Sequence, residues 1–282
     1  MVTIEPGGKG FNLAVQARRL NATVDGIFAV GDDLGARLAR DAFVKARLAE
    51  TMLLTVPGAT GAGVGFTDAA GETCLSVAPG ANSSLAADHI RSRQGDIIRS
   101  TMVLAQFETS DAAIAEAFAV ARLAGIPTLL NPSPFRPIAD TILANTAIIV
   151  VNGSEARACA EQLGLARSAG EAWGEAIAPA LLARGVEIVV ATHGAAGATA
   201  ITADTVLRQP AFAIDAVDTL GAGDAFAATL AVSLSEGMGL ADALERAAAA
   251  GALTSLRDGV FAALPDAATL DGFLSERQSG LE

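Results

Sequence analysis

The stretch VDTLGAGDAFAATL, residues 217–230, joins three small residues and an aspartate to an apolar run. Helical periodicity begins directly after the glycines, since Phe226, Leu230 and Leu234 fall on one face of a helix. The small residues 221–223 then present backbone N–H groups at the positive end of that helix, with no large side chain to block approach. Such a loop is an anion hole suited to a phosphoryl group whose charge grows in the transition state.

Asp224 directly follows this loop, and its carboxylate allows two interpretations. It is either an electrostatic partner of the helix N-terminus, as many aspartates at helix starts are, or a general base for a hydroxyl nucleophile. Phosphoryl transfer to an alcohol needs a base of this kind next to a site that stabilises the transferred group. The position beside an anion hole favours the general base.

The composition limits the possible partners. The 282 residues are 51% hydrophobic, which is enough for a substantial core, and no apolar run has the length of a transmembrane helix. Asp and Glu (31) outnumber Lys and Arg (19), and the formal net charge of −12 argues against nucleic acid or an anionic membrane as partner. A phosphorylated ligand remains compatible, because backbone N–H groups hold phosphate without side-chain charge.

Three chemically reactive residue types are scarce. Cys74 and Cys159 make neither a disulfide framework nor a metal site, so we expect two thiols in a cytoplasmic protein. The 2 histidines give little support to a histidine metal cluster or a Ser-His-Asp triad. Lys9 and Lys45 are the only lysines, and Lys9 lies between glycines in GGKG, which favours a functional role over a plain surface role.

Short apolar runs alternate with amphipathic segments along most of the chain. Strands buried on both faces are expected at 23–30, 100–106, 126–131, 147–152 and 186–192, because these runs are almost continuously apolar. Helices are expected at 11–20, 33–43, 111–125, 154–164, 171–185, 224–236, 240–253 and 266–277. The alternation predicts one α/β domain over residues 1–282, a three-layer α/β/α sandwich around a mostly parallel sheet.

The segment GAGVGFTDAAGETCLSV, residues 61–77, interrupts the alternation. It reads as two short strands around a turn at 68–71 and predicts a β flap that stands off the main sheet. A second hairpin-like stretch covers 197–214. The glycine cluster GATGAGVG (58–65) is not a dinucleotide fingerprint, because it leads into a strand instead of a helix, and no G-x-x-x-x-G-K-[ST] is present. A Rossmann dehydrogenase is therefore set aside.

The decisive stretch resembles the C-terminal signature of the ribokinase-like sugar kinases, also called the phosphofructokinase-B family. PGGKGFNLAVQARRLNATVDGIFAVGDDLG (6–35) resembles the N-terminal signature of the same family. Four short motifs follow in the family's order, namely PGAN (79–82), NPSP (131–134), NGSE (152–155) and THGAAG (192–197). The resemblance covers most of the chain and implies a ribokinase-like fold and an ATP-dependent carbohydrate kinase, with ribokinase the nearest member.

The resemblance also implies a role for particular residues in phosphoryl transfer. Asp224 would be the general base, with the amides of Gly221, Ala222 and Gly223 as the anion hole. The nucleotide would be bound by Asn152, Thr192, Gly194, Gly197 and Gly223. Mg²⁺ would be organised by Glu155 and Asn152. A K⁺ site would include Asp218 and the Leu220 carbonyl. From the residues alone, NGSE is equally a strand-end turn in which Ser154 caps the next helix.

On the acceptor side, the resemblance implies a sugar pocket formed by Gly8, Lys9, Asn12, Asn82, Glu108 and Asp224. Glu108 is equally compatible with a solvated acid at a helix start. The flap at 61–77, with residues 1–6, would be a lid that excludes water from the reaction. Lids of this family often pair between subunits, so a homodimer is expected.

One departure from the family pattern concerns the start of the sheet. Members place a central strand, an aspartate that binds the sugar and a lid strand before GGKG, which begins here at residue 7. We therefore expect that strand and that aspartate to be missing. Two interpretations follow: a sugar kinase, for ribose or for fructose, 2-keto-3-deoxygluconate or a nucleoside such as adenosine, or a non-catalytic ligand-binding relative.

Overall fold

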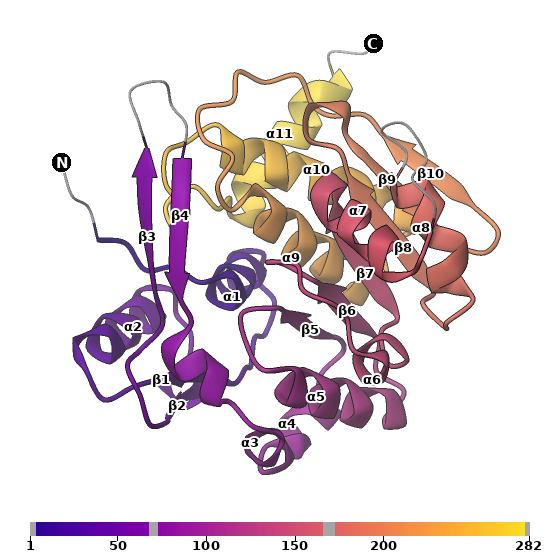
Figure 1. The fold of residues 1–282 in the computed structure, drawn as a ribbon. Coiled ribbons are helices and arrows are strands. Elements are labelled where there is room, and N and C mark those ends of the chain that lie inside the picture. The colour runs from indigo at the N-terminus through magenta and orange to yellow at the C-terminus, as the bar shows by residue number, and fades with distance from the viewer. Residues whose placement is uncertain (1–3, 68–72, 166–172, 280–282) are drawn as a thin grey trace.

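The computed structural model describes residues 4–67, 73–165 and 173–279, and its centre is a six-stranded sheet (Figure 1). The strands from β5 to β8 are parallel to one another, and β9 and β10 are added in antiparallel pairing. Across the sheet the order is β10 (Val206–Gln209), β9 (Ala198–Ile201), β8 (Ile188–Thr192), β7 (Ile148–Asn152), β6 (Thr128–Asn131) and β5 (Val103–Gln106).

Helices cover both faces of this sheet, which confirms the three-layer α/β/α sandwich. One face carries α1 (Lys9–Arg19), α9 (Ala222–Ser235) and α10 (Leu240–Ser255). The other carries α5 (Asp111–Leu123), α6 (Asp140–Leu143), α7 (Gly153–Gln162) and α8 (Trp173–Leu182). Around these layers lie α2 (Leu34–Lys45), α3 (Ala87–Arg91), α4 (Gln94–Ile98) and α11 (Ala267–Ser279), of which α3 and α4 pack on α5 and α11 packs on α10.

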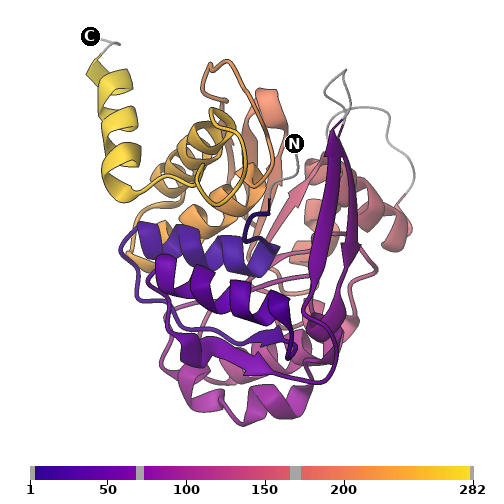
Figure 2. The ribbon, with the colours of Figure 1, turned by 90° about the vertical axis from the view of Figure 1, so that its left-hand side faces the viewer.

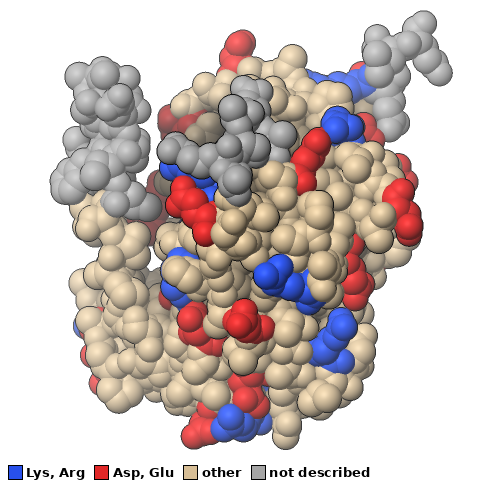
Figure 3. Space-filling view, turned by 45° about the vertical axis from the view of Figure 1, so that its right-hand side comes forward, with Lys and Arg blue, Asp and Glu red and all other residues tan. Residues whose placement is uncertain are grey.

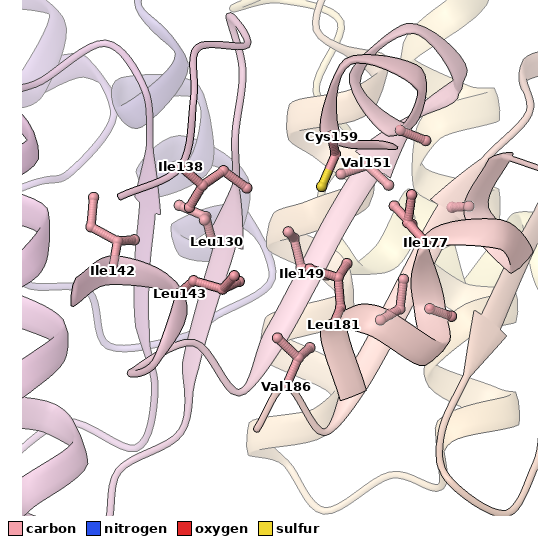
Figure 4. Close-up of a cluster of buried hydrophobic side chains, with 14 of the residues drawn as sticks. Leu130, Ile138, Ile142, Leu143, Ile149, Val151, Cys159, Ile177, Leu181 and Val186 are labelled. Atoms are coloured by element: carbon pink, nitrogen blue, oxygen red, sulfur yellow. The ribbon is translucent and has the colours of Figure 1, made fainter. Parts of the chain in front are cut away.

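The central strands are apolar along their whole length because both of their faces are buried. On β7, Ile148 and Val150 pack toward α9 and α10, whereas Ile149 and Val151 pack toward α7 and α8. Figure 4 shows the cluster on the side of α7 and α8, in which Ile149 and Val151 lie beside Ile177 of α8. Neighbouring residues of one strand therefore belong to different hydrophobic cores.

Two smaller sheets accompany the main one. β1 (Phe28–Val30) pairs in parallel with β2 (Leu53–Thr55), and among the described residues these strands pair only with each other. β3 (Ala62–Thr67) and β4 (Thr73–Ala78) form the antiparallel hairpin expected for the flap, and it projects from the sandwich in both ribbon views (Figures 1 and 2). The turn expected at 68–71 lies outside the described residues, as do residues 1–3 of the expected lid.

Three short 3-10 turns in the described part of the chain complete the fold. They are η1 (Glu50–Met52), η2 (Gly80–Ser84) and η3 (Gly194–Ala196).

The start of α7 differs from the Ser154 cap that the sequence allows, because the Asn152 side chain is the N-cap and Ser154 lies inside the helix. Asn152 accepts the Glu155 N–H while Glu155 accepts the Asn152 N–H, and this reciprocal pair fixes both side chains.

The surface carries charges of both signs. On the face in Figure 3, basic and acidic side chains are interspersed among uncharged ones instead of gathered by sign. Within the described part of the chain, no helix has the length and apolar character needed to cross a membrane.

Candidate active site

Polar side chains gather where the parallel strands end. Gln106, Asn131, Asn152 and Thr192 are the last residues of β5, β6, β7 and β8, and the register pairs Gln106 with Asn131 and Asn152 with Thr192. Because the carboxyl ends of parallel strands share one edge, these side chains lie along a common line. In open α/β sheets, ligands bind outside this edge.

Asp224 lies at this edge in the first turn of α9 and is buried, with 4% of its surface exposed. The Asn12 Nδ2 donates to Asp224 Oδ2 at 2.7 Å, and the Gln106 Nε2 donates to Asp224 Oδ1 at 2.9 Å. The Lys9 ammonium lies 3.8 Å from Asp224 Oδ1. Two amide donors and one nearby cation fix the orientation of this buried carboxylate.

The start of α1 brings three expected sugar-site residues together. Gly8 is the N-cap with φ of 112°, a backbone conformation that favours glycine, and the Lys9 N–H donates to Glu108 Oε2 at 2.6 Å. Burial raises the pKa of Glu108, the hydrogen bond and charge of Lys9 oppose that rise, and the negative charge of Asp224 adds to it. Glu108 therefore faces the site and is not the solvated acid that the sequence also allowed.

Asn82 lies in η2, at the base of the hairpin. Its backbone carbonyl accepts the Thr109 hydroxyl at 3.2 Å, which joins it to the loop that carries Glu108. A Cβ on Gly61 would come within 2.7 Å of Asn82 Nδ2, so this glycine allows the chain to pass close to the amide. The structure thus places Asn82 beside the loop of Glu108.

Glu155 lies in the first turn of α7 and is buried. Burial raises its pKa, the backbone hydrogen bond from Asn152 and a side-chain hydrogen bond with Ser133 lower it, and Lys9 and Asp224 act on it through their charges. Since α7 and α9 cover opposite faces of the sheet, Glu155 and Asp224 approach the same strand-end edge from its two faces. Among the described residues no group of three or more His, Cys, Asp or Glu side chains could hold a metal ion.

The loop after β8 follows the expected glycine pattern. Gly194 (φ 57°) and Gly197 (φ 95°) both adopt conformations that favour glycine, and a Cβ on Gly197 would lie 2.1 Å from the Gln209 carbonyl oxygen. His193 Nε2 is 3.2 Å from Thr199 Oγ1, so this histidine packs within the loop. Thr192, opposite Asn152 in the register, opens this loop.

Asp218 joins the loop before α9 to the loop that follows α10. Its carboxylate accepts the Leu220 N–H at 2.9 Å and the Gly259 N–H at 3.3 Å. Gly221 is the N-cap of α9 with φ of 79°, and the first N–H groups of α9 begin at Ala222. The sequence therefore placed the start of this helix two residues too late.

Gln106 and Asn131 were missed as site residues in the sequence analysis. Asn131 was noted only as part of the NPSP motif, and Gln106 only as the end of an expected strand. The available signal was that neighbouring apolar strands, VLAQ and TLLN, each end in a polar amide. Parallel pairing brings such residues side by side.

Together, the sheet with helices on both faces and the polar edge at its strand ends define an open α/β protein, a class in which ligands bind at such an edge. The model of the pfkB family carbohydrate kinases matches residues 1–267. The chain therefore belongs to the pfkB family of carbohydrate kinases. This membership confirms the family, the fold class and the sugar-kinase activity that the sequence implied.

Individual relatives agree with this assignment. The chain is similar to the ribokinase of Staphylococcus aureus (strain COL), with 30% identity over 261 residues, 92% of this chain and 84% of that protein. It is similar to the ribokinase of Mus musculus, with 34% identity over 232 residues, 81% of this chain and 71% of that protein. The crystal structure of ribokinase from Thermotoga maritima matches with a TM-score of 0.88 and 25% identity, covering 97% of this chain and 89% of that chain.

Proposed function

We propose that this chain transfers the γ-phosphoryl group of ATP to a hydroxyl of ribose. The observation that carries the proposal is the buried Asp224, which two amides hold at the N-terminus of α9, on the edge where the parallel strands end. Ribose is the first acceptor to test because the relatives from S. aureus and M. musculus are named ribokinases. Fructose, 2-keto-3-deoxygluconate and adenosine are the alternatives.

In the proposed reaction Asp224 accepts the proton of the attacking sugar hydroxyl. The hydroxyl oxygen forms a bond to the γ-phosphorus, the bond from that phosphorus to the β–γ bridging oxygen breaks, and ADP leaves. The backbone amides of Gly221, Ala222 and Gly223 stabilise the charge that develops on the transferred group. The positive end of α9 adds to this stabilisation.

The acceptor would bind between α1 and the loop after β5. Lys9 and Asn12 on α1, Asn82 in η2 and Glu108 offer both donors and acceptors to sugar hydroxyls, and the bare backbone of Gly8 allows close approach. The Asn12 Oδ1 is buried and has no hydrogen-bond partner among the described residues, so it is available to a hydroxyl donor.

The nucleotide would lie along the ends of β7 and β8, beside Asn152, Thr192, Gly194, Gly197 and Gly223. The donor set fits a Mg²⁺ ion that keeps most of its waters, because Glu155 and Asn152 would supply one carboxylate and one amide, and in the described part of the chain no group of three or more His, Cys, Asp or Glu side chains adds to them. When bound with ATP, Mg²⁺ neutralises phosphate charge.

Two further parts of the proposal concern a monovalent cation and the lid. Asp218 and the Leu220 carbonyl would hold K⁺ between the loops that Asp218 already joins. The hairpin of β3 and β4 would close over the sugar as a lid of a single domain spanning 1–282, and would pair with a second copy in a homodimer. Exposed valines on the hairpin, Val64 and Val77, support the last step.

The test is an ADP-release assay with Mg²⁺ and K⁺ over a panel of sugars and nucleosides. We expect turnover with ribose, and we expect Asp224→Asn to lower kcat roughly 100- to 10,000-fold while its thermal unfolding stays cooperative. Asp215→Asn, at an exposed carboxylate of the preceding loop, is the matched control and should retain full activity. Near-normal turnover by Asp224→Asn would rule out the base, and sugar or ATP binding without turnover in the wild type would favour a non-catalytic relative.

A further inference from the structure

Two buried amides connect Asp224 to the backbone of the sheet. The Gln106 Nε2 donates both to Asp224 Oδ1 at 2.9 Å and to Asn131 Oδ1 at 2.7 Å. The Asn131 Nδ2 in turn donates to the Val150 carbonyl of β7 at 2.8 Å. The bond between the two amides joins β5 to β6, and the bond to Val150 joins β6 to β7, so a carboxylate on α9 is held through three strands of the sheet.

The order of donors and acceptors fixes both amide orientations. A carbonyl can only accept, so Asn131 must present its NH₂ to Val150 and its oxygen to Gln106. Gln106 must then turn its NH₂ toward two acceptors, because a flipped amide would face both of them with its oxygen. The rigid sheet backbone therefore determines which atom faces Asp224.

This arrangement has a cost that folding alone does not explain. Gln106 is 5% exposed, and its Oε1 is buried with no hydrogen-bond partner among the described residues. An apolar side chain of the same length would avoid the loss of that acceptor's hydration. Retaining an amide here is reasonable if its NH₂ group has a task at Asp224.

We propose that Gln106 is a positioning residue for the general base and that Asn131 acts through it. The inference rests on the proposed function, because it needs Asp224 to be the base. Gln106 holds Asp224 Oδ1 while Asn12 holds Oδ2, so the plane of the carboxylate is set from two sides. A base in fixed orientation loses less entropy when it meets the substrate hydroxyl.

Removing the donor has two measurable consequences. First, kcat should fall roughly 10- to 100-fold, the worth of a hydrogen bond to a charged group, while KM for sugar changes little, because Gln106 is not part of the proposed sugar pocket. Second, a carboxylate with one donor fewer binds a proton more readily, so the acid limb of the pH–rate profile should move to higher pH.

Other charges also face this carboxylate and remain in place in such a variant. They are Lys9 on α1, Glu108 in the loop after β5 and Glu155 on α7. The Lys9 ammonium favours the ionised form and the two acids oppose it. Because all three are common to variant and wild type, a displaced acid limb reports the lost donor.

The experiment compares wild type with Gln106→Met, Asn131→Leu and the double variant in the ADP-release assay. Methionine has the length of glutamine and leucine has nearly the shape of asparagine, so the core keeps its volume. We expect Asn131→Leu to lower kcat less than Gln106→Met does, and to cause no further loss when Gln106 is already replaced. Such non-additivity is the mark of two residues that act in series.

Thr128→Val is the matched control at the opposite end of β6. Thr128 is buried, accepts the Ala147 N–H at 2.9 Å and donates to the Asn145 carbonyl, and lies at the amino end of β6, whereas Asn131 lies at its carboxyl end. It should lower stability without displacing the pH–rate profile. If Gln106→Met does not fold, Gln106→Leu replaces it.

Each outcome decides between the proposals. An inactive wild type overturns the proposed function, and this inference falls with it. An active wild type with Gln106→Met at near-normal kcat and an unmoved acid limb overturns the inference alone. Independent, multiplying losses in the double variant would leave Gln106 as a positioning residue but overturn the assignment of Asn131.

Discussion

Gly221 has a backbone conformation that favours glycine and lies in the proposed anion hole. Its φ of 79° is rare for residues with a side chain, and a Cβ there would lie 2.6 Å from Val260 Cγ1 in the loop after α10. We expect Gly221→Ala to lower kcat roughly 10- to 100-fold, because the start of α9 must shift and its N–H groups then miss the transferred phosphoryl. Kinetics of ADP release under saturating ATP measure the effect.

Two further variants separate the clash from the backbone strain. Gly221→Ala combined with Val260→Ala removes the clash and should recover part of the lost kcat. Gly125→Ala places alanine at a φ of 72° where the described residues leave the added methyl without a contact within 4 Å, at the far end of α5. It should cost about 1 kcal/mol of stability and leave kcat unchanged. A Gly221→Ala protein with normal kcat would show that the anion hole does not depend on this residue.

At the site, the residues that could be predicted from the sequence belong to long motifs, and the others do not. Asp224, Lys9 and Asn12 lie inside signatures that carry their own context, and the structure brings these three together. Gln106 and Asn131 lie at the ends of apolar strands, where a single polar residue looks like the end of the strand. Their connection depends on parallel register, which a single sequence does not reveal.

At the scale of elements, Arg136 clamps the loop between β5 and α5. Its guanidinium donates to the carbonyls of Phe107 and Thr109, which flank Glu108, and pairs with Asp111 at 2.5 Å. It also stacks over the Phe107 ring, 4.1 Å from the centroid. One planar side chain thus fixes the loop on both sides of a proposed sugar ligand.

We expect Arg136→Met to raise KM for the sugar roughly tenfold with little change in KM for ATP, since the loop lies on the acceptor side. Arg136→Lys should raise the KM for the sugar as well, because an ammonium cannot bind two carbonyls and a carboxylate in one plane. Initial-rate kinetics with each substrate varied in turn provide the measurement. Arg91→Met is the control: it removes a bidentate pair with Glu116 on the outer side of α5 and should change neither KM. An unchanged sugar KM in Arg136→Met would mean that the loop keeps its shape without the clamp.

Among the elements, predictability followed length and burial. The strands β6, β7 and β8 were predicted because both faces are buried and their sequences are apolar throughout. The expected strand at 23–30 narrows to β1 (Phe28–Val30), since Gly26 is not held in a ladder. β2 and α3 were not predicted, because neither is long enough to show a period and neither is buried along its whole length.

At the scale of the whole molecule, the hairpin of β3 and β4 is the part that the sandwich does not cover. Val64 pairs with Ser76 and Val77 pairs with Gly63, so the two valines point to opposite faces of the hairpin. They are 53% and 50% exposed. A two-stranded ribbon with apolar residues on both faces is marginal in water by itself, and a second copy of the chain would bury one of these faces.

We therefore expect the wild type to sediment as a dimer and either Val64→Lys or Val77→Lys to weaken dimerisation by roughly 10- to 100-fold, depending on which face the partner covers. The loss of dimer affinity is large because the lysine ammonium would be buried at the interface without a partner of opposite charge. Val44→Lys, at a valine of α2 that is 59% exposed, adds the same charge elsewhere and should leave the dimer intact. Analytical ultracentrifugation over a concentration series distinguishes the cases. Two results would contradict this prediction: a wild type that stays monomeric at every concentration, or lysine variants at both hairpin positions that dimerise as well as Val44→Lys. In either case the hairpin would not form the interface, and the proposed lid would act within a single chain.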